Sequence, residues 1–142
     1  MIAYLDSSAI LKQYLADEVG ADDLDAIQEI VTDLATSRLS YVEVRAGLAS
    51  ARRAQRLSPT GHDRAVASFE TAWATMDVVE LDGPLSRRAA DVADAFGLRT
   101  GDAIQLATAL EMARDEMVFV AWDLGLARAA RAAGIVTYPA EI

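Results

Sequence analysis

Short apolar runs alternate with stretches of helical periodicity along the whole chain, and this alternation constrains the fold more than any other feature. The apolar runs predict strands at residues 2–5, 35–38, 78–81, 117–121 and 135–138. The stretches between them predict helices after residue 7 and at residues 24–34, 41–55, 59–76, 84–96 and 100–114, with a short alanine-rich helix before residue 134. Strands that alternate with helices form a parallel sheet covered on both faces, so we expect an α/β fold with a central, mainly parallel sheet of about five strands.

The chain of 142 residues is long enough for one domain with a substantial core and short for two ordinary ones. No repeat, linker or low-complexity tract divides it, so residues 1–142 are expected to form a single domain. No run approaches the roughly 18 apolar residues of a membrane helix, and residues 1–10 lack the basic start and long apolar core of a signal peptide. We therefore expect a cytoplasmic protein with no membrane partner.

The composition limits the chemistry that the chain can perform. With 22 acids against 13 bases, the net charge of -9 argues against broad nonspecific binding of nucleic acid, so a polyanionic substrate would have to be held locally. The absence of Cys excludes disulfides, thiolate metal sites and cysteine nucleophiles. The only His, His62, is alone and is expected in a polar turn at the surface.

Four carboxylates stand where the chain is predicted to enter a helix, namely Asp6, Glu43, Asp102 and Asp123, and three of them follow a predicted strand. The carboxyl ends of parallel strands share one edge of a sheet, so side chains distant in sequence would converge there. Clustered carboxylates repel each other by about 4 kcal/mol per pair at ~4 Å and an effective dielectric of ~20, and a functional cluster therefore needs a cation. Oxygen ligands select hard ions such as Mg²⁺ or Mn²⁺, of which one or two could bind.

Each of the four acids is also explained as part of a helix N-terminus. Asp is a preferred N-cap, and the helix dipole favours any acid in the first turn. Ser40 and Glu43 fit the capping-box pattern, in which Ser40 caps the helix and the Glu43 side chain turns back to its amide. Taken singly, each acid is better explained as structural, and only the four together indicate a metal site.

Four strings resemble those of PIN-domain ribonucleases in order and spacing, and the likeness is greatest to toxins of the VapC type: YLDSSAI, SRLSYVEVRAGL, LRTGDAIQLATAL and FVAWDLGLARAARAAGI. The resemblance covers nearly the whole chain. It implies a three-layer α/β/α PIN-like fold and hydrolysis of RNA phosphodiester bonds with Mg²⁺ or Mn²⁺ held by a carboxylate cluster. It also implies a type II toxin–antitoxin system with a small antitoxin that binds and silences the toxin, and we expect a homodimer.

The resemblance gives each acid an expected role as metal ligand and catalytic residue, because Asp6, Glu43, Asp102 and Asp123 match the family's four acids in order. Ser8 matches a small polar residue that assists at the site. Thr100 fits either a contact near the site or a helix cap, and its spacing from Asp102 favours the cap. The hydroxyl often found just before the fourth acid is missing, because Ala121 and Trp122 stand there. Asp123 is therefore the least secure ligand, and the alternative is an indirect role, either behind the direct ligands or through water.

The expected chemistry needs a way to hold both metal and phosphate. A divalent ion at about 2.1 Å from carboxylate oxygens lowers the pKa of bound water and neutralises charge that develops on a phosphodiester. Arg38 and Arg99 lie next to the strings that carry Glu43 and Asp102, so they are the candidates for binding RNA phosphates.

Three other readings compete with a nuclease. A receiver-like signalling domain that binds Mg²⁺ and a protein partner would need a Lys after a late strand, and the only Lys is Lys12. An aspartyl phosphatase would need a second Asp where Ser8 stands. A catalytically silent member that binds a partner would be expected to lack one of the acids, and all four are present.

Overall fold

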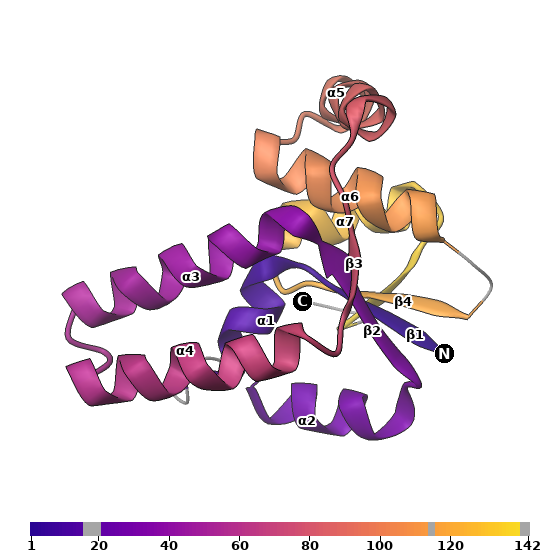
Figure 1. The fold of residues 1–142 in the computed structure, drawn as a ribbon. Coiled ribbons are helices and arrows are strands. Elements are labelled where there is room, and N and C mark those ends of the chain that lie inside the picture. The colour runs from indigo at the N-terminus through magenta and orange to yellow at the C-terminus, as the bar shows by residue number, and fades with distance from the viewer. Residues whose placement is uncertain (16–20, 114–115, 140–142) are drawn as a thin grey trace.

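The structure is a computed structural model that describes residues 1–15, 21–113 and 116–139. Five short strands in these residues form one parallel sheet at the centre of the molecule (Figure 1). The strands are β1 (Ile2–Leu5), β2 (Asp33–Ser37), β3 (Asp77–Val79), β4 (Met117–Val120) and β5 (Val136–Tyr138). Their order is β3-β2-β1-β4-β5, which places β1 in the middle. The predicted parallel sheet of about five strands is confirmed.

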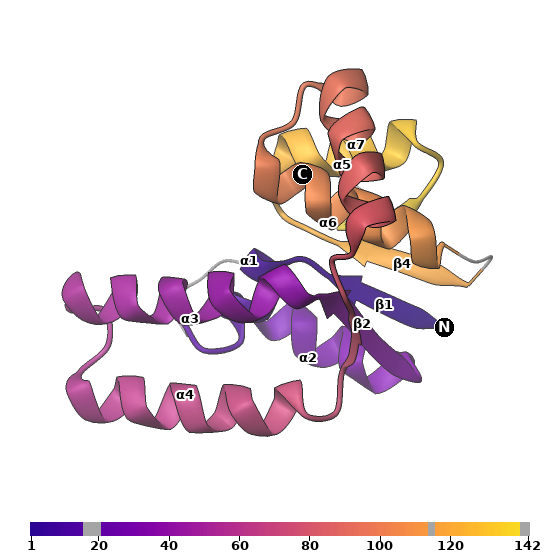
Figure 2. The ribbon, with the colours of Figure 1, turned by 45° about the horizontal axis from the view of Figure 1, so that its top comes forward.

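Helices cover both faces of the sheet, which confirms the predicted three-layer α/β/α arrangement. One core lies between the Ala3 and Leu5 face of the sheet and four helices: α1 (Ser7–Lys12), α2 (Ala21–Ile30), α3 (Arg38–Arg53) and α4 (Pro59–Trp73). The opposite core contains Tyr4 and is covered by α6 (Thr100–Met112) and α7 (Leu124–Ala132), with α5 (Gly83–Phe96) packed on α6. Figure 2 shows α5, α6 and α7 on one side of the sheet and α2 and α4 on the other. Because successive strand residues face opposite sides, β1 contributes to both cores.

The boundary between α2 and β2 differs from the prediction. The predicted helix over 24–34 is too long, because β2 begins at Asp33 and Leu34 pairs with Ala3 of β1. The side chain of Leu34 packs against the core that also buries Leu24 of α2. The apolar periodicity continues past the end of the helix because both elements bury side chains in one core.

The start of α3 also differs from the prediction. The helix begins at Arg38, and its N-cap is Ser37, whose hydroxyl accepts a hydrogen bond from the Leu39 amide at 3.1 Å. The predicted capping box of Ser40 and Glu43 is therefore wrong. Ser40 is instead fully buried in the first turn of α3. The sequence offers two serines three residues apart, and either suits an N-cap, so the pattern alone did not distinguish them.

Two further local predictions are wrong and one is confirmed. α6 begins at Thr100 with Arg99 at the N-cap and no side-chain capping bond, so Thr100 is not the cap. His62 lies in α4 rather than in a turn, and only 15% of its side chain is exposed. α5 ends at Phe96, as the predicted helix over 84–96 does, and Gly97 follows it with a left-handed φ of 65°. None of the described helices is long and apolar enough to cross a membrane.

Candidate active site

Asp6 and Asp123 lie at the same edge of the sheet, where the chain leaves β1 and β4. Asp6 directly follows β1 and Asp123 follows β4, and these two strands are parallel neighbours. Each acid caps the next helix, because Asp6 accepts a hydrogen bond from the Ala9 amide and Asp123 accepts one from the Leu126 amide, both at 2.8 Å. These caps fix the two carboxylates at the carboxyl edge of the sheet.

Asp6 is a buried carboxylate with only 4% of its surface exposed. Its oxygens also accept a hydrogen bond from the Ser8 hydroxyl, at 2.9 and 3.1 Å, so Ser8 contacts the first acid of the site. The pKa of Asp6 is raised to about 7, first by burial and then by the charges of Asp102 and Glu43, against the bonds from Ala9 and Ser8.

Asp102 lies in the first turn of α6 and interacts with the other acids. Its pKa is raised by burial first and then by the charges of Asp123 and Glu43, while Arg99 lowers it. The charge of Asp102 in turn raises the pKa of Asp6. The fold therefore brings the other three predicted acids within electrostatic reach of Asp102, although they come from distant parts of the sequence.

Glu43 lies in the second turn of α3 and reaches the start of α6. Its Oε1 accepts a hydrogen bond from Gln105 Nε2 at 3.0 Å. Its Oε2 lies so near Gly101 that a Cβ built on this glycine would be only 3.1 Å away. Because residue 101 has no side chain, the Glu43 carboxylate can lie against the helix turn that carries Asp102.

Gln105 is the site residue that sequence reasoning missed. It is 2% exposed and belongs to the buried face of α6, among Ala103, Leu106 and Ala109. A buried amide costs free energy unless it is hydrogen-bonded, so a lone Gln on an apolar helix face indicates partners elsewhere in the fold. That signal was present in the sequence.

The donor set of the site fits a hard divalent cation. It consists of carboxylate oxygens, and the raised pKa values of Asp6 and Asp102 show that negative charge is poorly compensated there. In the described part of the chain, however, no three acid or His side chains are turned toward a common point as a metal cage. Instead, three of the acids each accept a hydrogen bond from a different donor. Asp6 accepts from the Ala9 amide, Glu43 from the Gln105 side chain, and Asp123 from the Leu126 amide.

The two candidate arginines differ in their surroundings. Arg99 is exposed and close enough to Asp102 to lower its pKa. Arg38 makes a two-pronged ion pair with Glu80 and lies over the ring of Trp73, 5.9 Å from its centroid. RNA phosphate would therefore compete with Glu80 for Arg38, whereas Arg99 lies near Asp102 and is not paired with Glu80.

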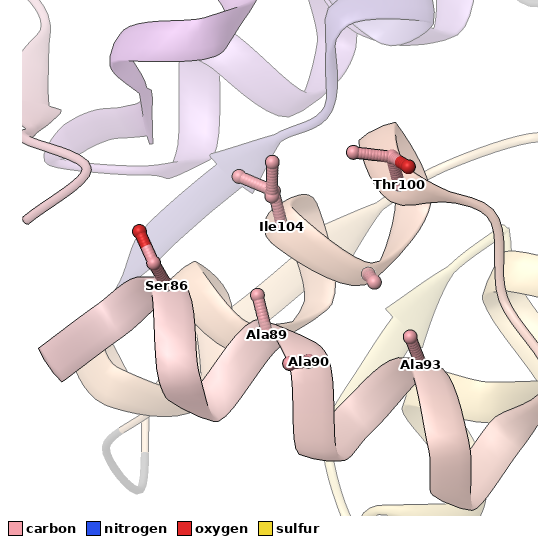
Figure 3. A pocket seen from close by; sticks show the side chains of 7 residues that line it. Ser86, Ala89, Ala90, Ala93, Thr100 and Ile104 are labelled. Carbon is pink, nitrogen blue, oxygen red and sulfur yellow. The ribbon is translucent and has the colours of Figure 1, made fainter. Parts of the chain in front are cut away.

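Thr100 contributes to a different feature. Its side chain lines a hollow of about 330 Å³ between α5 and α6, together with small residues such as Ala89, Ala93 and Ala103 (Figure 3). Thr100 belongs to the same first turn of α6 as Asp102.

Replacing Asp6 by Asn is expected to stabilise the metal-free protein at alkaline pH. The raised pKa means that the wild type is most stable below the ordinary carboxyl pKa and loses that stability as pH rises through about 7. Asn keeps the N-cap without the buried charge, so Asp6→Asn should gain about 1 to 3 kcal/mol of unfolding free energy at pH 8 and little at pH 4. Urea unfolding in EDTA at both pH values tests this, and a less stable variant at pH 8 would contradict it.

Comparison with known protein families finds one family over most of the chain. The family model described as "PIN domain" matches residues 3–132. The chain is also 36% identical over 141 residues to Ribonuclease VapC45 of Mycobacterium tuberculosis, which covers 99% of this chain and 97% of the relative.

Two solved structures are similar in fold. Mycobacterium tuberculosis VapC20, described as a Sarcin-Ricin loop cleaving toxin, has a TM-score of 0.68 and 17% identity, covering 94% of this chain and 96% of that one. A toxin–antitoxin complex from Klebsiella pneumoniae contains a chain with a TM-score of 0.58 and 20% identity, with 84% of each chain covered. At such identities the likeness concerns the fold alone.

Proposed function

Because this chain belongs to the PIN domain family, we propose that it is a metal-dependent endoribonuclease and the toxin of a type II toxin–antitoxin system. The similarity to a VapC ribonuclease over nearly its whole length supports this function. The observation that carries the metal dependence is the buried Asp6 carboxylate, whose pKa is raised by burial and by the charges of Asp102 and Glu43.

In the proposed site, Asp6, Glu43 and Asp102 hold Mg²⁺ or Mn²⁺, and Asp123 contributes directly or through water. The bound ion would supply an activated water and neutralise charge on the phosphodiester. Ser8 keeps the Asp6 carboxylate oriented through its hydroxyl. The protein residues thus act by fixing and orienting negative charge, whereas no general base of their own is required.

Arg99 is the proposed phosphate ligand, with Arg38 second because RNA would have to displace Glu80 from it. Two or three phosphate contacts on single-stranded RNA give a slope of log affinity against log salt of about -1.4 to -2.1. Binding measured in Ca²⁺ should show this shallow slope, and Arg99→Ala should flatten it by about 0.7. Arg64→Ala, an exposed arginine of α4, is the control. A slope several times steeper, or unchanged affinity in Arg99→Ala, would place the basic contacts elsewhere.

The endoribonuclease assignment is tested by incubating purified protein with total RNA in Mg²⁺, Mn²⁺ or EDTA and mapping the new RNA ends. We expect cuts at a limited set of positions that disappear in EDTA and return when the ion is restored. Cleavage that is indifferent to EDTA would refute the metal-dependent mechanism, and the absence of cleavage in either ion would refute the enzyme assignment.

A small antitoxin is the proposed protein partner, and a homodimer the proposed assembly. The similarity to VapC ribonuclease supports the partner, as does the fold shared with a chain of a toxin–antitoxin complex. An acidic site with an exposed arginine at its edge suits blockage by complementary charged groups of such a partner.

Replacing Gly101 by Ala is expected to lower activity without lowering stability. Ala favours a helix over Gly by about 0.5 to 1 kcal/mol, but its Cβ would push the Glu43 carboxylate aside by a few tenths of an ångström. We expect metal affinity and cleavage to fall about 10-fold while unfolding free energy stays equal or rises. Gly83→Ala at the start of α5, where a Cβ meets open space, is the control. An equal loss in both variants, or none in Gly101→Ala, would contradict the role assigned to this close approach.

A further inference from the structure

A hydrogen-bonded chain inside the fold joins four of the elements that surround the acids. Gln105 of α6 lies at its centre and contacts Tyr4 of β1 and both Ser40 and Glu43 of α3. The Ser40 hydroxyl is 2.7 Å from that of Thr36 in β2. Apart from the half-buried Glu43, these residues are almost completely buried, so their hydrogen bonds are shielded from competing water.

The Tyr4 hydroxyl determines which way the Gln105 amide faces. It donates to Gln105 Oε1 at 2.6 Å. As a donor, the phenol O–H needs an acceptor, and the acceptor that the Gln105 amide offers is its oxygen. The Tyr4 ring is held in turn by stacking on Phe119, with the centroids 5.4 Å apart. The amide oxygen of Gln105 therefore faces Tyr4, and its NH₂ group must face the other way.

The two N–H bonds of the Gln105 amide are both used. One points to Glu43 Oε1 and the other to Ser40 Oγ, each at 3.0 Å. The Thr36 hydroxyl donates to the Leu5 carbonyl at 2.7 Å, which leaves the Ser40 hydroxyl to donate to Thr36. Every donor then has an acceptor, and the chain ends on the carbonyl directly before Asp6.

We propose that Gln105 is a positioning residue that holds the Glu43 carboxylate beside the helix turn that carries Asp102, where it is available to the proposed metal site, with Tyr4 and Ser40 fixing the amide that does so. This inference rests on the proposed metal site. Gln105 anchors one oxygen of Glu43, Oε1, and leaves Oε2 beside the helix turn of Asp102. Glu43 is thereby prevented from swinging away into solvent, which a long, half-exposed side chain would otherwise do at little cost.

The test is the affinity for Mn²⁺, measured by electron paramagnetic resonance, in Gln105→Met. Met has nearly the same shape but cannot donate to Glu43. Loss of a partner that orients a metal ligand costs about 10- to 100-fold in metal affinity, and we expect that loss here. RNA cleavage by this variant should recover toward the wild-type rate as the Mn²⁺ concentration is raised. Tyr4→Phe, which keeps the ring stacking and frees the amide to flip, should show a smaller loss of affinity.

Two comparisons separate positioning from a general effect on folding. Leu106→Ala destabilises the same buried helix by creating a cavity and should leave the Mn²⁺ affinity within about 3-fold of wild type. In a Glu43→Ala background, Gln105→Met should still lower thermal stability but should no longer change Mn²⁺ affinity. This non-additivity is the signature of a residue that acts through Glu43.

Three results would overturn the inference while leaving the metal site intact: wild-type affinity in Gln105→Met, an equal loss in Leu106→Ala, or an undiminished effect of Gln105→Met in the Glu43→Ala background. Failure of the wild type itself to bind Mn²⁺ would overturn the proposed metal site and this inference with it. If Gln105→Met does not fold, Tyr4→Phe provides the test. An unchanged Mn²⁺ affinity in Tyr4→Phe would also count against the inference.

Discussion

Asp102→Asn is expected to lower metal-dependent RNA cleavage at least about 1,000-fold. Asp102 interacts with each of the other three acids, so its charge is the one that a bound ion would most need. Metal-ion stabilisation of developing charge contributes several kcal/mol, and each ~1.4 kcal/mol is a factor of about ten in rate. Asn preserves the shape of the side chain but removes the charge. Single-turnover cleavage of a short RNA containing a mapped cut site measures the effect.

The fold of Asp102→Asn should survive the substitution. The variant loses a favourable interaction of about 0.3 to 1 kcal/mol with the N-terminus of α6 and gains relief from repulsion by Asp123 and Glu43. Its unfolding free energy in EDTA should therefore lie within about 1 kcal/mol of wild type. Asp94→Asn, on the exposed side of α5, is the matched control and should cleave normally. Full RNA cleavage by the Asp102→Asn protein in EDTA would refute the proposed mechanism.

Expression of the wild-type chain without a partner is expected to arrest growth, and Asp6→Asn is expected to abolish the arrest. The change removes a buried charge from the proposed metal site while Asn still caps α1, so the variant should accumulate as folded protein. Colony counts after induction, together with the amount of soluble protein, measure the effect. Normal growth and intact RNA in cells that express soluble wild-type protein would refute the toxin assignment.

The parts of the fold that could be predicted are those in which one residue pattern has one structural solution. β1 and β4 are short apolar runs, each followed by a helix-capping acid, directly after β1 and after two intervening residues in the case of β4, and both were located from the sequence. Helix and strand boundaries were predicted wrongly where the same residue pattern fits two different structures. Leu34 fits the helical period of α2 and the alternation of β2 equally well, and tertiary pairing with Ala3 decides between them. Ser37 and Ser40 are both good caps and both are fully buried, and only their hydrogen-bond partners tell them apart: Ser37 accepts from the Leu39 amide, whereas Ser40 bonds to Thr36 and Gln105.

The acids of the candidate site and Ser8 could be named from the sequence, whereas Gln105 and Gly101, the residues that contact Glu43, could not. Acids at strand ends and helix starts imply convergence, because parallel strands share a carboxyl edge. Gln105 could not be placed in the same way, since its partners lie 101 and 62 residues away, at Tyr4 and Glu43. The importance of Gly101 depends likewise on the approach of α3, which is a property of helix packing and not of the local sequence.

The most direct test of the central claim is a Mn²⁺ titration, followed by electron paramagnetic resonance, of the wild type and of single Asn or Gln variants of the four acids. The proposed site predicts saturable binding to the wild type that weakens at least about 10-fold in Asp6→Asn, Glu43→Gln and Asp102→Asn. Asp123→Asn should weaken it less, since Asp123 is exposed and already serves as the cap of α7. Identical titration curves for the wild type and the first three variants would show that these carboxylates do not hold the metal.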